Sequence, residues 1–303
     1  MLPFARVSII GLGLIGSSIA RAVREAMPGV RLAGHDADPE VRGTARALGL
    51  CDDVADQAGA AVIDADLVVL CVPVGAIGDV AAEIAPDLPA DAVVSDVGSC
   101  KASVVRALDA ALPAGQAVVP AHPVAGTERS GPEAGFAGLF RGRWCILAPT
   151  DRSPAVAVER VAEFWRRLGA HVELMDPDHH DRVLAVTSHL PHLIAYTIVG
   201  TASDLEEVTR SEVIKYSAGG FRDFTRIAAS DPTMWRDVFL QNREAVLDML
   251  QRFSEDLAHL QRAIRREDGD TLHDLFTRTR AVRRSIVEQG QDVGSQDFGR
   301  SRS

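Results

Sequence analysis

The chain has 303 residues, of which 47% are hydrophobic and 24% are charged, and its formal net charge at pH 7 is −10. This length predicts two domains that each bury a core of their own, and the composition is that of an ordinary globular protein. The negative charge argues against a nucleic-acid partner, which needs a basic face, and the absence of an apolar run near the roughly 20 residues of a membrane span argues against a membrane partner.

The first strong pattern is the stretch RVSIIGLGLIG from Arg6 to Gly16, which predicts a strand, a tight turn and a helix over 15–26. In the turn, Gly11 permits the bend, Gly13 lets backbone amides approach a pyrophosphate, and Gly16 lets the helix pack closely on the strand. Leu14 and Ile15 open the helix, whose N-terminus faces the anion. The pattern therefore predicts a dinucleotide site, with a glycine-rich turn that binds nothing as the alternative.

Asp36 follows a second apolar run, 30–34, and lies 20 residues beyond Gly16. A carboxylate at this spacing accepts hydrogen bonds from the adenosine ribose. It favours NAD over NADP because it repels a 2′-phosphate. Arg42 is near enough in sequence to keep NADP as a less favoured alternative.

The rest of the first half alternates strands with helices. The apolar patterns predict strands over 67–72, 92–97, 117–121, 144–148 and 171–175 and helices over 39–48, 76–85, 101–112 and 154–168, with a glycine-rich loop over 124–142. Strand 67–72 is apolar on both faces, as in a parallel sheet. We expect seven or eight strands in one doubly wound, Rossmann-type α/β domain.

After Asp176 the pattern becomes helical, over 178–202, 206–216, 232–265 and 270–288. We expect a dinucleotide-binding domain over 1–176, an all-α substrate and dimerisation domain over 177–288, and a disordered tail over 289–303. Long apolar helix faces favour a homodimer through the second domain, and a monomeric helical cap is the alternative.

The N-terminus has no signal-peptide pattern, so we expect a cytoplasmic location. Four scattered cysteines, Cys51, Cys71, Cys100 and Cys145, are predicted to be free thiols.

Two polar residues follow predicted strands at the edge of the sheet where ligands bind. Ser99 stands after strand 92–97 at a predicted helix start, so it is either an N-cap or a hydroxyl presented to a ligand. His122 follows strand 117–121 and is either a structural histidine or a base. At this edge an imidazole with a pKa near neutrality can take a proton from a hydroxyl while hydride leaves the same carbon.

The helical half adds further polar candidates. His189 and His192 share one helix face in SHLPH, but the surrounding sequence offers no third metal ligand, so substrate contact is the preferred interpretation for His189 and we expect no metal. Gly219 and Gly220 precede Arg222 and Arg226, which form a plausible clamp for an anion. The alternative is two solvated surface arginines.

Five segments, GLGLIGSS, DVGSCK, HPVAGTERSG, SHLPH and GGFRDFTRIAASDPTMW, occur in the order and with the spacing found in prephenate and arogenate dehydrogenases of tyrosine biosynthesis. From Arg6 to about Arg284 the chain resembles this family. The resemblance implies a nucleotide-binding domain followed by a helical dimerisation domain.

The resemblance also implies the roles of individual residues. His122 would bond the ring C4 hydroxyl and act as base, with Ser99 assisting at the same hydroxyl. His189 would contact the substrate and Arg226 would bind a substrate carboxylate. Positions near the active-site entrance are Thr127, Glu128 and Asp223.

The expected reaction is the NAD-dependent conversion of prephenate to 4-hydroxyphenylpyruvate by hydride loss from C4, CO2 release and aromatisation. Arogenate as substrate, giving tyrosine, is the main alternative. Two weaker alternatives are a hydroxyacid dehydrogenase of the 6-phosphogluconate type, for which the first long helix after Asp176 lacks the required lysine, and a non-catalytic NAD-binding protein.

Overall fold

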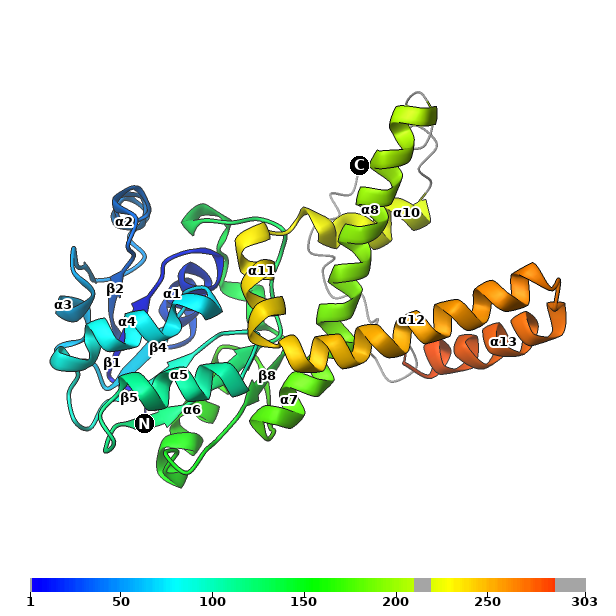
Figure 1. Cartoon of the computed structure of the whole chain (residues 1–303). Coiled ribbons are helices and arrows are strands. Elements are labelled where there is room, and N and C mark those ends of the chain that lie inside the picture. Colours follow the sequence, from blue (N-terminus) through cyan, green and yellow to red (C-terminus); the bar gives the residue numbers. More distant parts are fainter. Residues whose placement is uncertain (1, 210–218, 287–303) are drawn as a thin grey trace. The chain divides into compact units, whose positions relative to one another are not determined.

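The computed structural model describes residues 2–209 and 219–286 (Figure 1). The chain divides into two compact units, 1–246 and 247–303. Every sheet strand and every candidate site residue lies in the first unit.

The first unit contains a six-stranded sheet in the order β3-β2-β1-β4-β5-β6, and all five pairings are parallel. Its strands are β1 (Arg6–Ile10), β2 (Arg31–His35), β3 (Asp53–Val54), β4 (Leu67–Leu70), β5 (Val93–Asp96) and β6 (Ala117–Val119). This order is that of the Rossmann fold, which confirms the predicted fold class. The two-residue strand β3 was not predicted, because it is too short to show a period.

The prediction of one sheet of seven or eight strands was wrong, because a second, three-stranded sheet is formed by β7 (Ala121–Pro123), β8 (Trp144–Leu147) and β9 (His171–Leu174). The predicted strand 117–121 is interrupted at Pro120, which has no N–H to donate to a ladder. Beyond Pro120 the chain pairs antiparallel with β8, and His122 lies opposite Ile146. His122 therefore lies beyond the edge of the parallel sheet, where ligands of this fold bind.

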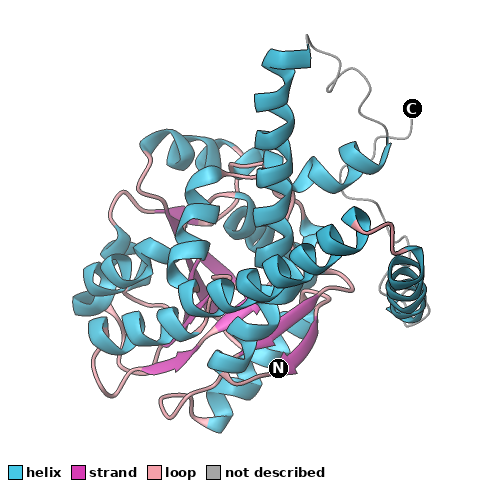
Figure 2. Cartoon of the chain, turned by 45° about the vertical axis from the view of Figure 1, so that its right-hand side comes forward, coloured by secondary structure: helices cyan, strands magenta, loops and turns pink. Residues whose placement is uncertain are grey.

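Helices cover both faces of the parallel sheet (Figure 2). They are α1 (Leu14–Ala26), α2 (Pro39–Ala47), α3 (Ala58–Val62), α4 (Ile77–Ile84), α5 (Ala102–Ala111) and α6 (Ala155–Arg167), with short 3-10 turns η1 (Val74–Ala76), η2 (Ala85–Asp87), η3 (Pro132–Ala134) and η4 (Ala137–Phe140). In β4, Leu67 and Val69 pack with α1 and α6, whereas Val68 and Leu70 pack with α4 and α5. The strand is thus buried on both faces, and each such side chain contributes about 1.5–3 kcal/mol of transfer free energy.

After β9 the described chain is helical, which confirms the predicted second half. Its elements are α7 (Pro177–Leu184), a π-helical turn η5 (Ala185–His189), α8 (Leu190–Thr209), α10 (Gly219–Thr225), the 3-10 turn η6 (Arg226–Ala229), α11 (Pro232–Gln241), α12 (Arg243–Arg265) and α13 (Gly269–Ile286).

Two details of this half differ from the predicted pattern. Gly219 and Gly220 begin α10 rather than forming a loop, and the predicted helix 232–265 is broken at Asn242, whose φ of −105° and ψ of 34° are not helical. The predicted helix 206–216 is described only to Thr209, within α8, and the predicted tail 289–303 lies outside the described residues.

The continuous helical stretch Pro177–Asp204 contains an 18-residue window with a mean hydropathy of 1.4, and by length and composition it could span a membrane, contrary to our expectation. It nevertheless carries the buried polar side chains of His180, Asp181 and His189. Only 28% of that window is buried within the described chain.

The second unit consists of most of α12 together with α13, which run beside each other as a helical hairpin (Figure 1). Glu267 ends α12 with a φ of 54°, and the Asp268 carboxylate caps α13 by accepting the Thr271 N–H at 3.0 Å. Several large apolar side chains of this hairpin are exposed, namely Leu247, Leu257, Ile264, Phe276 and Val282.

Candidate active site

The glycine-rich turn after β1 has the geometry of a dinucleotide site. Gly11 has a φ of +98°, and a Cβ added there would lie 2.4 Å from the Cys71 carbonyl oxygen. A Cβ at Gly16 would lie 1.9 Å from the Gly11 carbonyl oxygen, so neither position tolerates a side chain. A Cβ at Gly13, in contrast, meets no atom within 4 Å, so this side of the turn is open to a ligand.

The adjoining end of α1 is open to an anion. The helix has no side-chain cap and no acidic residue in its first turn, and Leu14 and Ile15 are half-buried there. Uncapped N–H groups with a positive dipole end fit a pyrophosphate.

Asp36 lies directly after β2, beside this turn. Its Oδ2 accepts the Leu12 N–H at 2.8 Å and its Oδ1 accepts the Asp38 N–H at 3.0 Å. Arg42 donates to the backbone carbonyls of Asp36, at 2.7 Å, and of Ala37, at 3.0 Å. The carboxylate is thus held at the position where a ribose is recognised in this fold.

Asp181, on α7, binds the start of α5. Its carboxylate accepts the N–H of Lys101 at 2.7 Å and that of Ala102 at 3.0 Å. The N-cap interpretation of Ser99 was therefore wrong: α5 begins at Ala102, and a carboxylate from another helix satisfies its first N–H groups. Ser99 is half-buried in the turn between β5 and α5.

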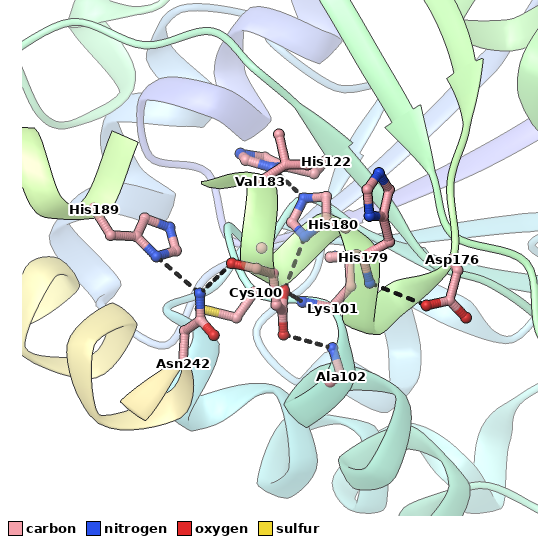
Figure 3. A network of polar contacts seen from close by, with 12 residues as sticks. Cys100, Lys101, Ala102, His122, Asp176, His179, His180, Val183, His189 and Asn242 are labelled. Atoms are coloured by element: carbon pink, nitrogen blue, oxygen red, sulfur yellow. Dashed lines mark hydrogen bonds and ion pairs between the residues drawn. The ribbon is translucent and has the colours of Figure 1, made fainter. Parts of the chain in front are cut away.

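A chain of three side chains runs from Asp181 through His180 to His122. Figure 3 shows the link between His180 and His122. Asp181 Oδ1 and His180 Nδ1 are 2.8 Å apart, and His180 Nε2 and His122 Nδ1 are also 2.8 Å apart. Both rings and the carboxyl group are buried. Burial raises the pKa of Asp181, but hydrogen bonds from the His180 ring and the Lys101 N–H outweigh it and lower this pKa, so the group is a carboxylate at neutral pH.

Both imidazoles of this chain are neutral at pH 7. Burial lowers the pKa of His122 well below 6.5, and the neighbouring His180 ring lowers it further. Burial also lowers the pKa of His180 in spite of the hydrogen bond to Asp181, which raises it. A neutral imidazole is the form that can accept a proton.

His189 lies at the end of the π-helical turn η5, where the Leu190 N–H reaches back to the Ala185 carbonyl. The wider turn ends at a fully buried ring whose Nδ1 is 3.1 Å from Asn242 Nδ2. Asn242 Nδ2 also donates to the Asp181 carbonyl at 2.8 Å. Burial lowers the pKa of His189 to about 4, so this ring is neutral as well.

The Trp235 ring contacts the rings of both His189 and His192. His192 stacks on Trp235 with centroids 3.6 Å apart, and the Trp235 ring is 6.0 Å from that of His189. Burial lowers the pKa of His192, and the positive charge of Arg226 adds to this shift. Arg226 is therefore near enough to His192 for its charge to act on that ring.

Arg226 is exposed at the start of η6, and its Nη1 is 3.2 Å from the Glu128 carboxylate. Thr127 lies in the same loop as Glu128 and accepts the Arg129 N–H at 3.2 Å. Asp223 is exposed, with an oxygen 3.9 Å from the Arg222 guanidinium. The structure brings Arg226 and Glu128 together. Among the described residues, Asp223 pairs only with Arg222 and not with the buried histidines.

A buried ion pair between Lys101 and Asp96, each with a side chain 0% exposed, contacts the backbone of Ala121, the residue before His122. Lys101 also donates to the Ala121 carbonyl at 2.7 Å, and Asp96 accepts the N–H groups of Ala121 at 3.1 Å and Gly98 at 2.7 Å. This pair fixes the residue before His122 to the loop that carries Ser99.

Sequence reasoning missed five members of the cluster: Asp96, Lys101, His180, Asp181 and Asn242. For Asp96 the available signal was a carboxylate inside the apolar strand 92–97, since such a residue is buried only when it is paired. His180, Asp181 and Asn242 stand in polar stretches, DPDHHDR and QNRE, which gave no such signal. All four cysteines are free, as predicted. Among the described residues, no group of three His, Cys, Asp or Glu side chains gathers in a way that could hold a metal ion.

Comparison with known proteins agrees with this geometry. Residues 19–174 match the family model of the prephenate dehydrogenase nucleotide-binding domain, and residues 176–278 match that of the prephenate dehydrogenase dimerization domain. A cyclohexadienyl dehydrogenase of Zymomonas mobilis is 47% identical over 94% of this chain and 97% of its own length. A prephenate dehydrogenase of Bacillus subtilis is 35% identical over 89% of this chain and 73% of its own length.

Among solved structures, prephenate dehydrogenase from Aquifex aeolicus in complex with hydroxyphenyl propionate and NAD+ is similar, with a TM-score of 0.86 and 35% identity over 94% of this chain and 98% of that one. The two family models together include His122, the histidine cluster of the helical half and Arg226. The chain therefore belongs to the prephenate dehydrogenase family.

Proposed function

We propose that this protein oxidises prephenate to 4-hydroxyphenylpyruvate with NAD+, releasing CO2, as a step of tyrosine biosynthesis. Membership of the family supports dehydrogenase chemistry. The observation that carries the proposal is His122, a buried neutral imidazole whose Nδ1 is engaged by His180, so that Nε2 is the nitrogen available to a substrate hydroxyl.

NAD+ is the proposed cofactor, and it supplies the hydride acceptor when it is bound. The open face of Gly13 and the uncapped end of α1 would hold its pyrophosphate, and Asp36 would accept from its adenosine ribose. The carboxylate of Asp36 would repel the 2′-phosphate of NADP+. Because Arg42 is hydrogen-bonded to the backbone of residues 36 and 37, it does not cancel this charge.

The four main site residues have complementary roles in the proposal. His122 would accept from the C4 hydroxyl, with Ser99 assisting at the same group. His189 would donate a hydrogen bond to the substrate, and Arg226 would bind a substrate carboxylate with its planar guanidinium. Thr127, Glu128 and Asp223 would line the entrance, where Glu128 holds Arg226 at 3.2 Å.

In the reaction, the hydroxyl proton moves towards Nε2 of His122 while hydride leaves C4. The bond between C1 and its carboxylate breaks, its electron pair enters the ring, and CO2 departs. The proton then returns to the phenolate oxygen, so no net proton is released. Because aromatisation drives the reaction, the residues mainly have to hold C4 within ~3–3.5 Å of the hydride acceptor and orient the hydroxyl.

Arogenate is the alternative substrate, and oxidation of it would give tyrosine. It carries an ammonium group where prephenate has a keto group, so discrimination depends on the side chains near this tail. A neutral His189 ring would donate to the keto oxygen of prephenate or to a carboxylate, and the carboxylates are common to both substrates.

Steady-state kinetics with prephenate and arogenate, each with NAD+ and NADP+, tests the proposal through the nicotinamide absorbance. We expect the largest kcat/KM for prephenate with NAD+. His122→Asn is the matched inactive control, because it keeps a polar side chain but removes the base. A wild-type protein that turns over neither substrate, or that prefers arogenate, would contradict the proposal.

We also propose that the protein is a homodimer assembled through its helical half. The second family model describes a dimerization domain, and the α12–α13 hairpin exposes large apolar side chains, among them Ile264 at 64% and Val282 at 57%. Sedimentation equilibrium would give about twice the 32.4 kDa chain mass. A monomer at micromolar concentration would contradict this assignment.

A further inference from the structure

Two chains of hydrogen bonds start from one residue, Asp181, and each ends at a different histidine. Figure 3 shows their last links, His180 to His122 and Asn242 to His189. The Asp181 carboxylate leads through His180 to His122, and the Asp181 backbone carbonyl leads through Asn242 to His189. All five residues are at most 6% exposed, so water does not compete effectively for these bonds.

The first chain determines which nitrogen of His122 carries the proton. The Asp181 carboxylate only accepts, so His180 must donate from Nδ1. A neutral His180 then has a lone pair on Nε2, and His122 must donate to it from Nδ1. Nε2 of His122 is therefore left as an acceptor.

The second chain sets the opposite arrangement on His189. The Asp181 carbonyl also only accepts, so the group 2.8 Å from it is the NH2 of Asn242. Its other hydrogen points to Nδ1 of His189, which must accept, and the ring proton is then on Nε2. Within the described residues this Nε2 is buried and makes no hydrogen bond of ordinary geometry. The Ser99 backbone carbonyl raises the pKa of the ring by accepting from it, and an Nε2–H satisfies this acceptor while Nδ1 accepts from Asn242.

We propose that His180 and Asn242 are positioning residues which, both anchored on Asp181, set opposite ring tautomers on His122 and His189, making the first an acceptor and the second a donor towards the substrate. The inference deepens the proposed function and rests on it for the identity of the substrate. The two opposite tautomers are expected in the free protein as well, whatever the substrate is.

Loss of either link would leave a ring free to take the wrong tautomer. Without the His180 acceptor, His122 has no reason to keep its proton on Nδ1, and an Nε2–H form cannot take a proton from a hydroxyl. The nearby charges of Lys101 and Asp96 are engaged with each other and with the Ala121 backbone, so they do not replace the His180 acceptor.

Nitrogen NMR of the full-length protein, labelled with ¹⁵N-histidine and free of ligand, reads the tautomers directly. We expect Nδ1–H, Nε2-unprotonated signals for His122 and His180, and the reverse pattern for His189, at pH 7. Single substitutions at these positions assign the signals. An Nε2–H signal from His122, or an Nδ1–H signal from His189, overturns the inference.

The variant pair His180→Leu and His180→Gln separates positioning from packing. Leucine removes the acceptor, whereas a glutamine amide oxygen can still accept from Nδ1 of His122. We expect His180→Leu to abolish the single tautomer of His122 and to lower kcat between about 10²- and 10⁴-fold, as wrong-tautomer variants of catalytic triads do. His180→Gln should restore both the tautomer and most of kcat, with the KM for NAD+ nearly unchanged.

His179 offers a matched control, because it is the preceding residue on α7 and its side chain is exposed. His179→Leu should leave kcat and the His122 signal as in the wild type. Full activity of His180→Leu overturns the inference without affecting the proposed function. Absence of wild-type turnover with prephenate and arogenate refutes the proposed function instead, while the tautomer signals still test the inference.

Discussion

Protonation of the buried His189 ring should make the protein less stable in mild acid. Burial lowers the pKa of this ring from 6.5 to about 4. Between these two values the unfolded chain binds more protons at this site than the native one. The free energy of unfolding therefore rises with pH through this window, is fully present above pH 6.5, and is lost as the pH falls towards 4.

The magnitude follows from the two pKa values. Lowering the pH from 7 to 5 protonates the unfolded ring almost completely but the native ring by only about a tenth, which removes about 2 kcal/mol from the free energy of unfolding. Since the side chain is 0% exposed, solvent does not screen this effect. Burial lowers the pKa of His122, His180 and His192 as well, so the wild-type loss is larger than that from His189 alone.

A variant comparison isolates the contribution of this one ring. In His189→Asn, the new amide oxygen can still accept from Asn242, but no group there titrates near pH 5. Urea unfolding followed by circular dichroism, at one protein concentration and without ligand, should show about 2 kcal/mol less loss between pH 7 and 5 than in the wild type. The exposed His179→Asn is the control and should lose as much as the wild type. Equal losses in wild type and His189→Asn would refute the reasoning.

His122→Asn should lower kcat by about 10²- to 10⁴-fold and leave NAD+ binding by calorimetry unchanged, and full turnover would show that the base lies elsewhere. Arg226→Gln should mainly raise the KM for prephenate, by about 10- to 100-fold for one lost charge-assisted bond, and an unchanged KM would remove this residue from the substrate site. Lys101→Met should cost about 3–5 kcal/mol in urea unfolding because it leaves the Asp96 charge buried and unpaired, and Lys101→Met with Asp96→Asn should recover part of this loss. Asp36→Ser should raise kcat/KM with NADP+ relative to NAD+, and an unaltered ratio would contradict the role of this carboxylate.

Local patterns were enough to predict the glycine turn and the central strands. Gly11 and Gly16 were identified from spacing alone, and in the structure both positions exclude any side chain. These features are local, because a tight turn and a buried parallel strand each impose their composition on a few consecutive residues. The helices after Asp176 were also predicted, because the spacing of apolar residues changes there to the helical repeat.

The second sheet could not be predicted from the same patterns. Residues 117–121 look like one strand, but Pro120 divides them, and the pairing of β7 with β8 depends on contacts between distant segments. For the same reason the N-cap of α5 was one of two interpretations of Ser99, although the Asp181 carboxylate, 80 residues after Lys101, performs it.

The sequence by itself determined the fold class, the dinucleotide turn and the residue types His122, His189 and Arg226, because each follows from spacing, composition or a motif along the chain. Only the tertiary structure decided that Asp181 is linked to both histidines. The links run through His180 to His122 on β7 and through Asn242 to His189 on η5. The tautomer of a buried ring is set by donors and acceptors within about 3 Å of its two nitrogens. Those neighbours come from segments that are distant in the sequence, so they are defined only once the chain has folded.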